Sequence, residues 1–263
     1  GSDAASLIPC VDDPHDRASV VERAYPAIAR VVEAALTSED SDGCRLHAVT
    51  YSHMHRHTLQ CPSFTVHNDY TNPRQGFKQA QKILEGREDC VDLALSLPFY
   101  VVNVWTPLAA VKRDPLALCR WQGNRSLEDM AYPSPSVAAD DWYWVSEMVR
   151  GEAVIFKQFD SCTLPTEGSE WSAGARRRSA FTLHTSFHHA ALEATNPPPE
   201  PRRSIEYRVI VVEDARGVLP AHFGKKAMAE IANVAARAAE QRAAKARATG
   251  CSLRETTGMR GGT

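Results

Sequence analysis

Short segments rich in β-branched and aromatic residues recur through the middle of the chain, and turn-forming residues separate them. The segments are residues 44–58, 99–105, 115–119, 142–148, 152–161, 179–187 and 204–212. Such residues favour strands, because their side chains pack well on a pleated and half-buried surface. Many short strands of this kind predict a mainly β protein with a jelly-roll core.

Helical periodicity is expected on either side of these strands. Residues 17–37 carry apolar side chains at helical spacing, and Pro26 starts or kinks the main part of that helix. A short helix is expected over residues 73–86, where Gly86 ends it. The alanine-rich residues from about 225 to 249 predict a long helix near the end of the chain.

These elements predict one domain over residues 1–263, with a strand-rich core over about 44–213 and a loose tail after the last helix. A repeat of fixed period is absent from the sequence, which excludes solenoids and propellers. The strands are therefore expected to form a single core with flanking helices.

Composition and charge exclude several classes of partner. The formal net charge is -2 and the pI is near 6.6, so a broad basic field for nucleic acid or an anionic membrane is missing. The sequence contains neither a run of about 18 apolar residues nor a secretory leader pattern. We expect a cytoplasmic protein that acts on a small molecule, and a homodimer is compatible with this interpretation.

Seven cysteines are scattered along the chain without a C-x-x-C pair. Their odd number and irregular spacing argue against a disulfide framework and against a structural zinc site. We interpret them as reduced thiols.

The stretch FTVHNDYT, residues 64–71, places a histidine and an aspartate two positions apart in an expected strand. Side chains alternate along a strand, so His67 and Asp69 would project from the same face and converge on one point. Together they supply two ligands of a 2-His-1-carboxylate site, which binds Fe(II) and leaves coordination positions open. A motif as short as H-x-D also arises by chance, and a single histidine on a strand is more often structural.

A third ligand is expected on a later strand, in the stretch FTLHTSFHHA. This stretch offers His184, His188 and His189, and the first two share one face of the expected strand. We favour His184, because it lies in the middle of the strand and His188 lies near the end.

An Fe(II) site of this kind commonly works with 2-oxoglutarate, whose distal carboxylate needs an arginine. The planar guanidinium group meets a carboxylate with two parallel hydrogen bonds. The stretch PRRSIEYR offers Arg202 at its start and Arg208 within the strand, and Ser204 adds a hydroxyl donor. Either arginine fits the role, and the simpler interpretation is a set of surface charges with a structural ion pair.

Taken in order, these motifs resemble those of a known family. The motifs are VHNDYT, NVWTPL, DPLALC, WYWVSEM, EAVIFKQFDS, LHTSF and PRRSIEYRVIVV. From about Tyr25 to Val212 the chain resembles the fungal Fe(II)/2-oxoglutarate-dependent hydroxylase/desaturase family. That group includes gibberellin desaturase-like enzymes, toxin-pathway oxygenases and aziridine-forming amino-acid oxygenases. Several motifs in a fixed order are more specific than any one of them.

The resemblance implies a double-stranded β-helix that uses Fe(II), 2-oxoglutarate and O2. The metal ligands that it implies are His67, Asp69 and His184. The co-substrate residues that it implies are Arg202, Ser204, Arg208, Asn103, Trp105 and Lys157. For Asn103 and Trp105, the simpler interpretation is a capped strand end and a core aromatic residue.

Departures from the family pattern bear on the substrate. The family tends to have an aspartate after the residues ALC, where this chain has Arg120, and residues 53–57 are unusually rich in histidine. These differences lie where a substrate is expected to enter. Candidate substrate-binding residues are therefore Arg120, Arg74 and Tyr70.

The resemblance implies oxidation of an unactivated C–H bond of a small molecule in fungal secondary metabolism. The outcome would be hydroxylation, desaturation or oxidative cyclisation, such as aziridine formation from a free amino acid like L-valine. A larger polyketide or terpenoid is an alternative substrate and would need a wide apolar mouth. A non-catalytic small-molecule binding protein on the same fold is the alternative class. A zinc hydrolase is disfavoured, because no H-E-x-x-H motif occurs.

Overall fold

The computed structural model describes residues 8, 13–37, 43–57, 64–70, 73–120, 141–163, 180–190, 194, 197 and 199–248. The predicted loose tail after the last helix lies outside these residues, as do Cys10, Cys61 and Cys251. The described cysteines are free thiols, in agreement with the prediction.

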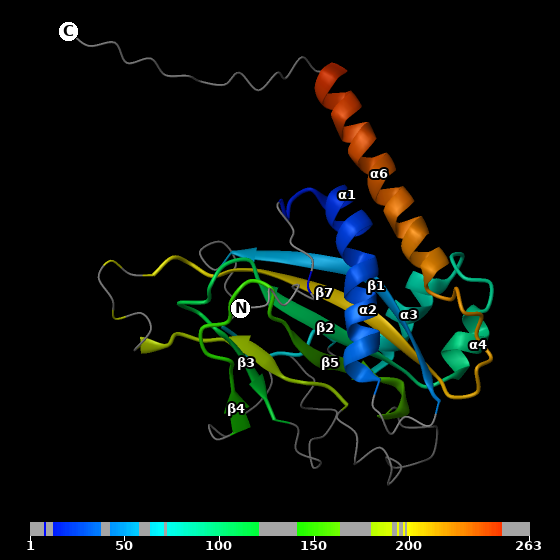
Figure 1. Ribbon diagram of the computed structural model, residues 1–263, viewed down its shortest axis with the longest axis horizontal. Helices are drawn as coiled ribbons and strands as arrows, with labels where there is room; N and C mark the ends of the chain where they lie inside the picture. The colour runs from blue at the N-terminus through cyan, green and yellow to red at the C-terminus, as the bar shows by residue number, and fades with distance from the viewer. Residues whose placement is uncertain are drawn as a thin grey trace, which may run out of the picture.

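The larger sheet has four antiparallel strands in the order β1-β7-β2-β5 (Figure 1). These strands are β1 (Arg45–His57), β7 (Arg203–Asp214), β2 (Phe99–Pro107) and β5 (Val154–Asp160). Strand β7 is central and pairs with β1 on one side and with β2 on the other. All four strands overlap segments whose composition predicted strands, and β2 and β7 extend one or two residues beyond the predicted bounds.

The smaller sheet has three antiparallel strands in the order β4-β3-β6. They are β4 (Trp142–Tyr143), β3 (Leu116–Cys119) and β6 (His184–Ser186). An isolated bridge between His67 and His184 joins the segment with the H-x-D motif to the outer strand β6. Two sheets with flanking helices confirm the prediction of a mainly β fold.

The N-terminal helical region is continuous but has three parts. These are α1 (Arg17–Ser19), the π-helix η1 (Val20–Ala24) and α2 (Tyr25–Leu36). Pro26 lies in the first turn of α2, directly after the π-helix, so the main part of the helix starts at this proline as predicted. The residues that α2 buries are Tyr25, Ile28, Ala29 and Val32.

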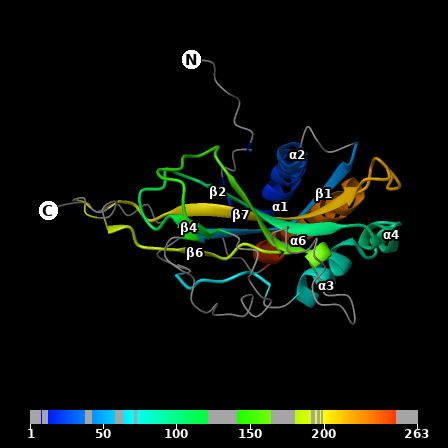
Figure 2. The same ribbon diagram turned by 90° about the horizontal axis from the view of Figure 1, so that it is seen from below.

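Helices α3 (Pro73–Leu84) and α4 (Val91–Ser96) follow the H-x-D segment, and α4 was not predicted. Gly86 lies beyond the end of α3 with a φ of 71°, a left-handed conformation that suits glycine. Figure 2 shows α2 on one side of the larger sheet and α3 on the other. Within α3, a Cβ atom added to Gly76 would lie 2.3 Å from the Phe159 ring, so the helix packs closely on β5.

The alanine-rich helix α6 (Lys225–Ala248) confirms the predicted C-terminal helix. Its start is fixed by the buried Glu88, whose Oε1 accepts hydrogen bonds from the backbone N–H groups of Gly224 and Ala227 at 3.0 and 2.9 Å. Ala227, Ile231 and Ala235 form its buried stripe. Within the described residues, the helices are too short or too polar to cross a membrane.

Strand β7 gives the larger sheet two different faces. Ile205, Tyr207 and Val209 are buried on the face that α2 covers, which we call the helix face, and the Tyr207 ring contacts the Tyr25 ring edge to face. The alternate residues Ser204, Glu206 and Arg208 point to the opposite side, which we call the ligand face.

Three predicted strands are shorter than expected. Residues 142–148 form only the two-residue β4, because the chain turns there and Glu147 has a φ of 51°. Within 179–187, only β6 pairs as a strand. The H-x-D segment is a bridge instead of a strand, since the Asn68 side chain donates a hydrogen bond to the Tyr70 carbonyl at 2.9 Å, a local turn that competes with strand pairing.

Candidate metal centre

His67, Asp69 and His184 come together as the sequence predicted. Their ligand atoms all lie within 4.8 Å of one another, and they are the one such group of three found in the part of the chain that the structure describes. His184 is buried, and the side chains of His67 and Asp69 are 12% and 10% exposed. Three convergent and largely buried ligands make a compact site that solvent barely reaches.

Backbone hydrogen bonds fix the two histidines relative to each other. The His67 N–H donates to the His184 carbonyl at 3.1 Å, and the His184 N–H donates back at 2.9 Å. The two imidazole rings consequently lie 4.3 Å apart between their centroids. A pair of hydrogen bonds in a sheet therefore sets the distance between two ligands from distant parts of the chain.

The imidazole groups are held in the form that binds metal. The Nδ1 atom of His67 lies 2.7 Å from the Thr65 carbonyl, and that of His184 lies 3.3 Å from the Thr182 carbonyl. A carbonyl accepts only, so each Nδ1 carries the proton and each Nε2 keeps its lone pair for a ligand bond. Burial and the neighbouring His67 lower the pKa of His184 to about 4, which keeps this ring neutral at neutral pH.

One carboxylate oxygen of Asp69 lies toward the histidines, and the other one interacts with polar side chains of the larger sheet. Its Oδ2 accepts a hydrogen bond from Asn103 at 2.9 Å and lies 3.0 Å from the Arg208 guanidinium, while Oδ1 lies 3.9 Å from His67 Nε2. Its backbone N–H donates to the Gln158 side chain at 2.9 Å. Although burial acts to raise the pKa of Asp69, Arg208 and the other neighbours lower it, so the group is ionised.

This donor set fits a divalent metal. Two neutral imidazoles and one carboxylate on one side of a site are the ligands of non-haem Fe(II) oxygenases. The ligand atoms lie within 4.8 Å of one another, which is close enough for one ion to contact all three.

A small cavity adjoins the triad. It is lined by His67, His184, Trp105, Leu116, Thr185, Ser186, Arg56, Arg202 and Glu206. Arg202 is 3% exposed, donates to the Asp114 carbonyl and lies over the Trp105 ring, 5.4 Å from its centre. Burial lowers the pKa of Arg202 to about 10, so the side chain remains charged at neutral pH.

The structure separates the two candidate arginines. Arg202 lines the cavity, whereas Arg208 is 27% exposed and pairs with the second carboxylate oxygen of Asp69, Oδ2. Ser204 lies between them on the ligand face and is buried. Asn103 holds Asp69, and Trp105 forms part of the cavity wall.

Lys157 does not reach this site, which corrects its assignment to the co-substrate. Its ammonium group lies 2.6 Å from the Asp160 carboxylate and 5.0 Å from the centre of the Tyr100 ring. Phe156, the residue before it, instead contacts the His184 ring, with centroids 5.0 Å apart. Alternation along β5 therefore points Lys157 to the opposite face.

The candidate substrate residues are also away from the cavity lining. Arg74 is exposed in the first turn of α3, and Arg120 is exposed just after β3. Tyr70 is buried, and its hydroxyl group lies 2.8 Å from that of Tyr51. These three positions stay predictions that the cavity does not support.

The histidine-rich part of β1 faces away from the metal ligands. His53, His55 and His57 alternate with Arg56, which lines the cavity. His53 Nδ1 lies 3.0 Å from the Tyr25 hydroxyl group on the helix face. We therefore no longer place these histidines at the substrate entrance.

Four residues of the site were missed from the sequence: Arg56, Asp114, Gln158 and Glu206. Glu206 had a usable signal, because it lies four positions after Arg202 and two before Arg208, and even spacings along a strand share one face. Gln158 and Asp114 had no such signal in the sequence, since each contacts a residue of the site that is distant along the chain.

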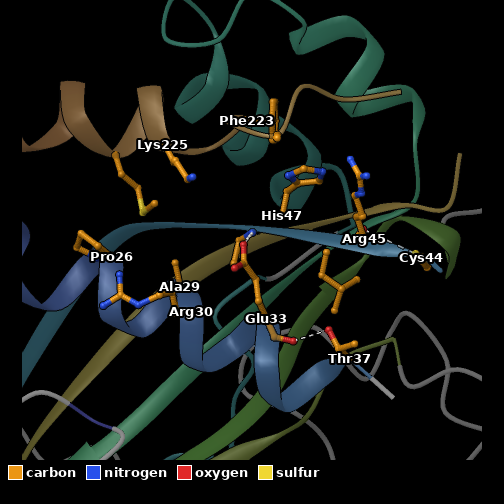
Figure 3. Close-up of a pocket in the computed structure, with 14 residues that line it drawn as sticks. Pro26, Ala29, Arg30, Glu33, Thr37, Cys44, Arg45, His47, Phe223 and Lys225 are labelled. Atoms are coloured by element: carbon orange, nitrogen blue, oxygen red, sulfur yellow. Dashed lines mark hydrogen bonds between the residues drawn. The ribbon is translucent and has the colours of Figure 1, made fainter. Parts of the chain in front are cut away.

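A larger cavity lies elsewhere, between α2, β1 and the start of α6 (Figure 3). Its lining includes Arg30, Glu33, His47, Phe223 and Lys225. The metal-ligand triad and the arginines of the small cavity are not part of this lining. The size of a hollow is therefore a poor guide to the position of the chemistry in this protein.

Comparison with known proteins now adds to the geometry. The family model described as the oxidoreductase/YMDC permease-like domain (YDMC) matches residues 9–212, well over half of the chain. The chain belongs to this family. Residues 9–212 contain the triad, the lining of the small cavity and both sheets except the last two residues of β7, so the YDMC family region includes the whole candidate site.

Solved structures similar to this YDMC family member are iron and alpha-ketoglutarate-dependent enzymes. The endoperoxidase NvfI matches with 23% identity and a TM-score of 0.55, over 75% of this chain and 72% of that chain. A tryptophan-to-phenylalanine variant of NvfI matches with 22% identity and the same TM-score, over 75% of this chain and 69% of that chain. The resemblance drawn from the motifs is thus confirmed at the level of the fold. Curated protein sequences gave no significant match.

Proposed function

We propose that the chain is an Fe(II)/2-oxoglutarate-dependent oxygenase that oxidises a C–H bond of a small molecule. The observation that carries this proposal is the arrangement of His67, Asp69 and His184, with both imidazole Nε2 atoms and one carboxylate oxygen directed at one point. Its fold, which is that of alpha-ketoglutarate-dependent enzymes, supports the same conclusion. Alpha-ketoglutarate and 2-oxoglutarate are the same compound.

The core of this enzyme is proposed to be a double-stranded β-helix. His184 comes from the smaller sheet, and the residues that hold Asp69 come from β2 and β7 of the larger sheet. The site therefore lies where the two sheets meet, as expected when two sheets form the walls of a jelly roll.

His67, Asp69 and His184 would hold the iron, and Arg208 and Asn103 would keep Asp69 in place. Iron with 2-oxoglutarate supplies an oxidant made from O2 that can remove hydrogen from an unactivated carbon. The protein keeps His184 neutral and Asp69 ionised, which is the form in which each of these two side chains binds a metal. Trp105, Leu116 and Phe156 limit the access of water to the reacting groups.

Arg202 is proposed to anchor the distal carboxylate of 2-oxoglutarate, with Ser204 as a second donor. The Asp114 carbonyl and the Trp105 ring hold the guanidinium group, so little side-chain freedom is lost on binding. Arg208 is less suited to this role, because its charge is already matched by Asp69 at 3.0 Å.

The substrate is proposed to be small and polar. Two guanidinium groups, of Arg56 and Arg202, and one carboxylate, of Glu206, line the cavity. This favours a free amino acid, such as L-valine, over a large polyketide or terpenoid, which would need apolar walls. Hydroxylation, desaturation and aziridine-forming cyclisation, as in fungal secondary metabolism, remain the proposed outcomes.

Succinate formation tests the proposal. Purified protein supplied with Fe(II), 2-oxoglutarate and O2 should release succinate, and the Asp69→Ala variant should release none above background. Absence of both iron binding and succinate from the wild-type protein would favour the non-catalytic binding protein instead.

A matched pair of variants tests the co-substrate anchor. Arg202→Met should weaken 2-oxoglutarate binding by about 2 to 5 kcal/mol, because a desolvated charge pair is lost. The neighbouring Arg203 is exposed, so Arg203→Met should leave binding unchanged. Equal losses in both variants, measured by calorimetry with Mn²⁺ in place of iron, would remove Arg202 from the anchor.

A further inference from the structure

Three buried polar side chains on the ligand face of β7 have atoms without a hydrogen-bond partner in the described part of the chain. Arg202 lies directly before the first residue of β7, Ser204 and Glu206 follow at alternate positions, and the three are 3%, 1% and 4% exposed. The atoms concerned are Arg202 Nε, Ser204 Oγ and Glu206 Oε1. Buried polar atoms are almost always paired in folded proteins, so a row of three indicates a site for a polar ligand.

The proposed co-substrate can satisfy only two of these three groups. Arg202 donates hydrogen bonds and Ser204 can donate one, and both suit the carboxylate of 2-oxoglutarate. Ionised Glu206 only accepts, and the 2-oxoglutarate dianion has only acceptors to offer. Glu206 therefore needs a donor from another molecule.

Among the described residues, no side chain hydrogen-bonds to Glu206 Oε1. The nearest cation of the same strand, Arg208, lies 3.9 Å from Glu206 Oε1 and is engaged with Asp69 at 3.0 Å. Arg56 and Arg202 line the same cavity and balance the charge of Glu206 at longer range. A buried carboxylate oxygen without a partner is costly, which makes it a strong binding point for an incoming donor.

We propose that Glu206 binds a protonated amine of the primary substrate, so that the substrate class is small amines that include amino acids. This inference rests on the proposed oxygenase function and deepens it. An ammonium group fits better than a hydroxyl group, because a charge-assisted hydrogen bond to a carboxylate is about twice as strong as a neutral one. Glu206 also lines the cavity that contains His67 and His184, so an amine bound there lies next to the metal ligands.

A rival role for Glu206 makes the opposite predictions. A protonated Glu206 could donate a hydrogen bond to 2-oxoglutarate, and burial together with Asp69 raises the pKa of Glu206 to about 7. In that role Glu206 would contribute to co-substrate affinity and not to the choice of substrate.

Calorimetry on the full chain loaded with Mn²⁺ and 2-oxoglutarate separates these roles. The probes are aliphatic amino acids and amines, each paired with its analogue without nitrogen, such as L-valine with isovalerate. Wild-type protein should bind at least one amine-bearing probe about 10-fold or more tightly than its partner, as one charged hydrogen bond predicts. Glu206→Gln should abolish that preference and leave the binding of isovalerate unchanged.

The affinity for 2-oxoglutarate is the control. It should be the same in wild type, Glu206→Gln and Glu206→Ala; a loss in Glu206→Ala that Glu206→Gln does not show would establish the rival role. Protein that binds Mn²⁺ and 2-oxoglutarate without preferring any amine would overturn this inference and leave the oxygenase proposal intact. Wild-type protein that binds neither Mn²⁺ nor 2-oxoglutarate would overturn both.

Discussion

The two faces of strand β7 differ in how their buried groups are paired. On the helix face, Tyr207 and Val209 pack against apolar side chains and α2, which includes Ile28, and only the Tyr207 hydroxyl group lacks a hydrogen-bond partner among the described residues of this pair. On the ligand face, Glu206 is equally buried but keeps an oxygen atom without a hydrogen-bond partner among the described residues. One strand thus carries a face that stabilises the fold and a face whose polar groups are ready for ligands. The comparison teaches that burial alone does not distinguish core from site, whereas a row of polar and charged side chains with unpaired buried atoms does.

The largest effect is expected from removing a metal ligand of the cavity that the ligand face of β7 helps to line. His184→Ala should lower Mn²⁺ or Fe(II) affinity by more than about 100-fold, since loss of a supporting residue alone costs about 10- to 100-fold. The control is His188→Ala, in the same segment and with a side chain that is 61% exposed. Metal content measured by mass spectrometry should fall only in the first variant, and equal binding in both would remove His184 from the site.

On the helix face, truncation should cost stability and leave metal binding alone. Ile28 is fully buried in α2, so Ile28→Ala should reduce the free energy of unfolding by about 2 to 5 kcal/mol. Arg30→Ala, at an exposed position of the same helix, should change it by less than about 0.5 kcal/mol. Urea unfolding with a parallel Mn²⁺ titration checks both, and a large drop in metal affinity for folded Ile28→Ala would contradict the separation of the two faces.

The pH dependence of stability should differ between wild type and Glu206→Gln. The pKa of Glu206 is raised to about 7 from 4.5, so its stabilising contribution is complete below about pH 4.5 and is lost as the pH rises through 7. Glutamine does not titrate. Between pH 4.5 and pH 8, the free energy of unfolding of the variant should therefore rise by about 3 kcal/mol relative to that of wild type. Metal-free protein unfolded by urea at both pH values measures this gain. If the difference in the free energy of unfolding between the two proteins does not vary with pH, the pKa of Glu206 is not raised by folding.

A smaller effect is expected at Arg208, which we assign as a positioning residue for Asp69. Arg208→Met should weaken Mn²⁺ binding by about 10- to 100-fold, because the second carboxylate oxygen loses its charged partner. The affinity of metal-loaded protein for 2-oxoglutarate should stay unchanged, in contrast to Arg202→Met. If calorimetry finds the reverse pattern, the roles of the two arginines must be exchanged.

Much of the architecture follows from local sequence. Strands β1, β2, β5 and β7 and helices α2, α3 and α6 all lie where composition and periodicity predicted them. The failures are the weakly paired segments around His67 and Trp142, where local turns and a two-residue pairing replace the expected strands. Strand pairing is decided by the partner strand, which a single segment does not specify.

The site was predicted in part, and the limit is of the same kind. Spacing by two places His67 near Asp69, and Arg202 and Arg208 on one face, but it does not say which arginine Asp69 occupies. Lys157 was assigned to the site because its motif resembles the family, and only the packing of Phe156 against His184 shows that it faces the other way. Two other expectations stay predictions: that the chain is a single domain, and that it forms a homodimer.

The backbone bridge between His67 and His184 joins parts of the chain that are more than a hundred residues apart. A metal ion can bind both histidines only when the two segments are paired. It therefore binds the folded chain in preference to chains in which this pairing is lost. By mass action, free metal at about 100 times its dissociation constant would add about 2.7 kcal/mol to the docked form. Under the proposed function, the metal would then stabilise the folded chain as well as complete the site.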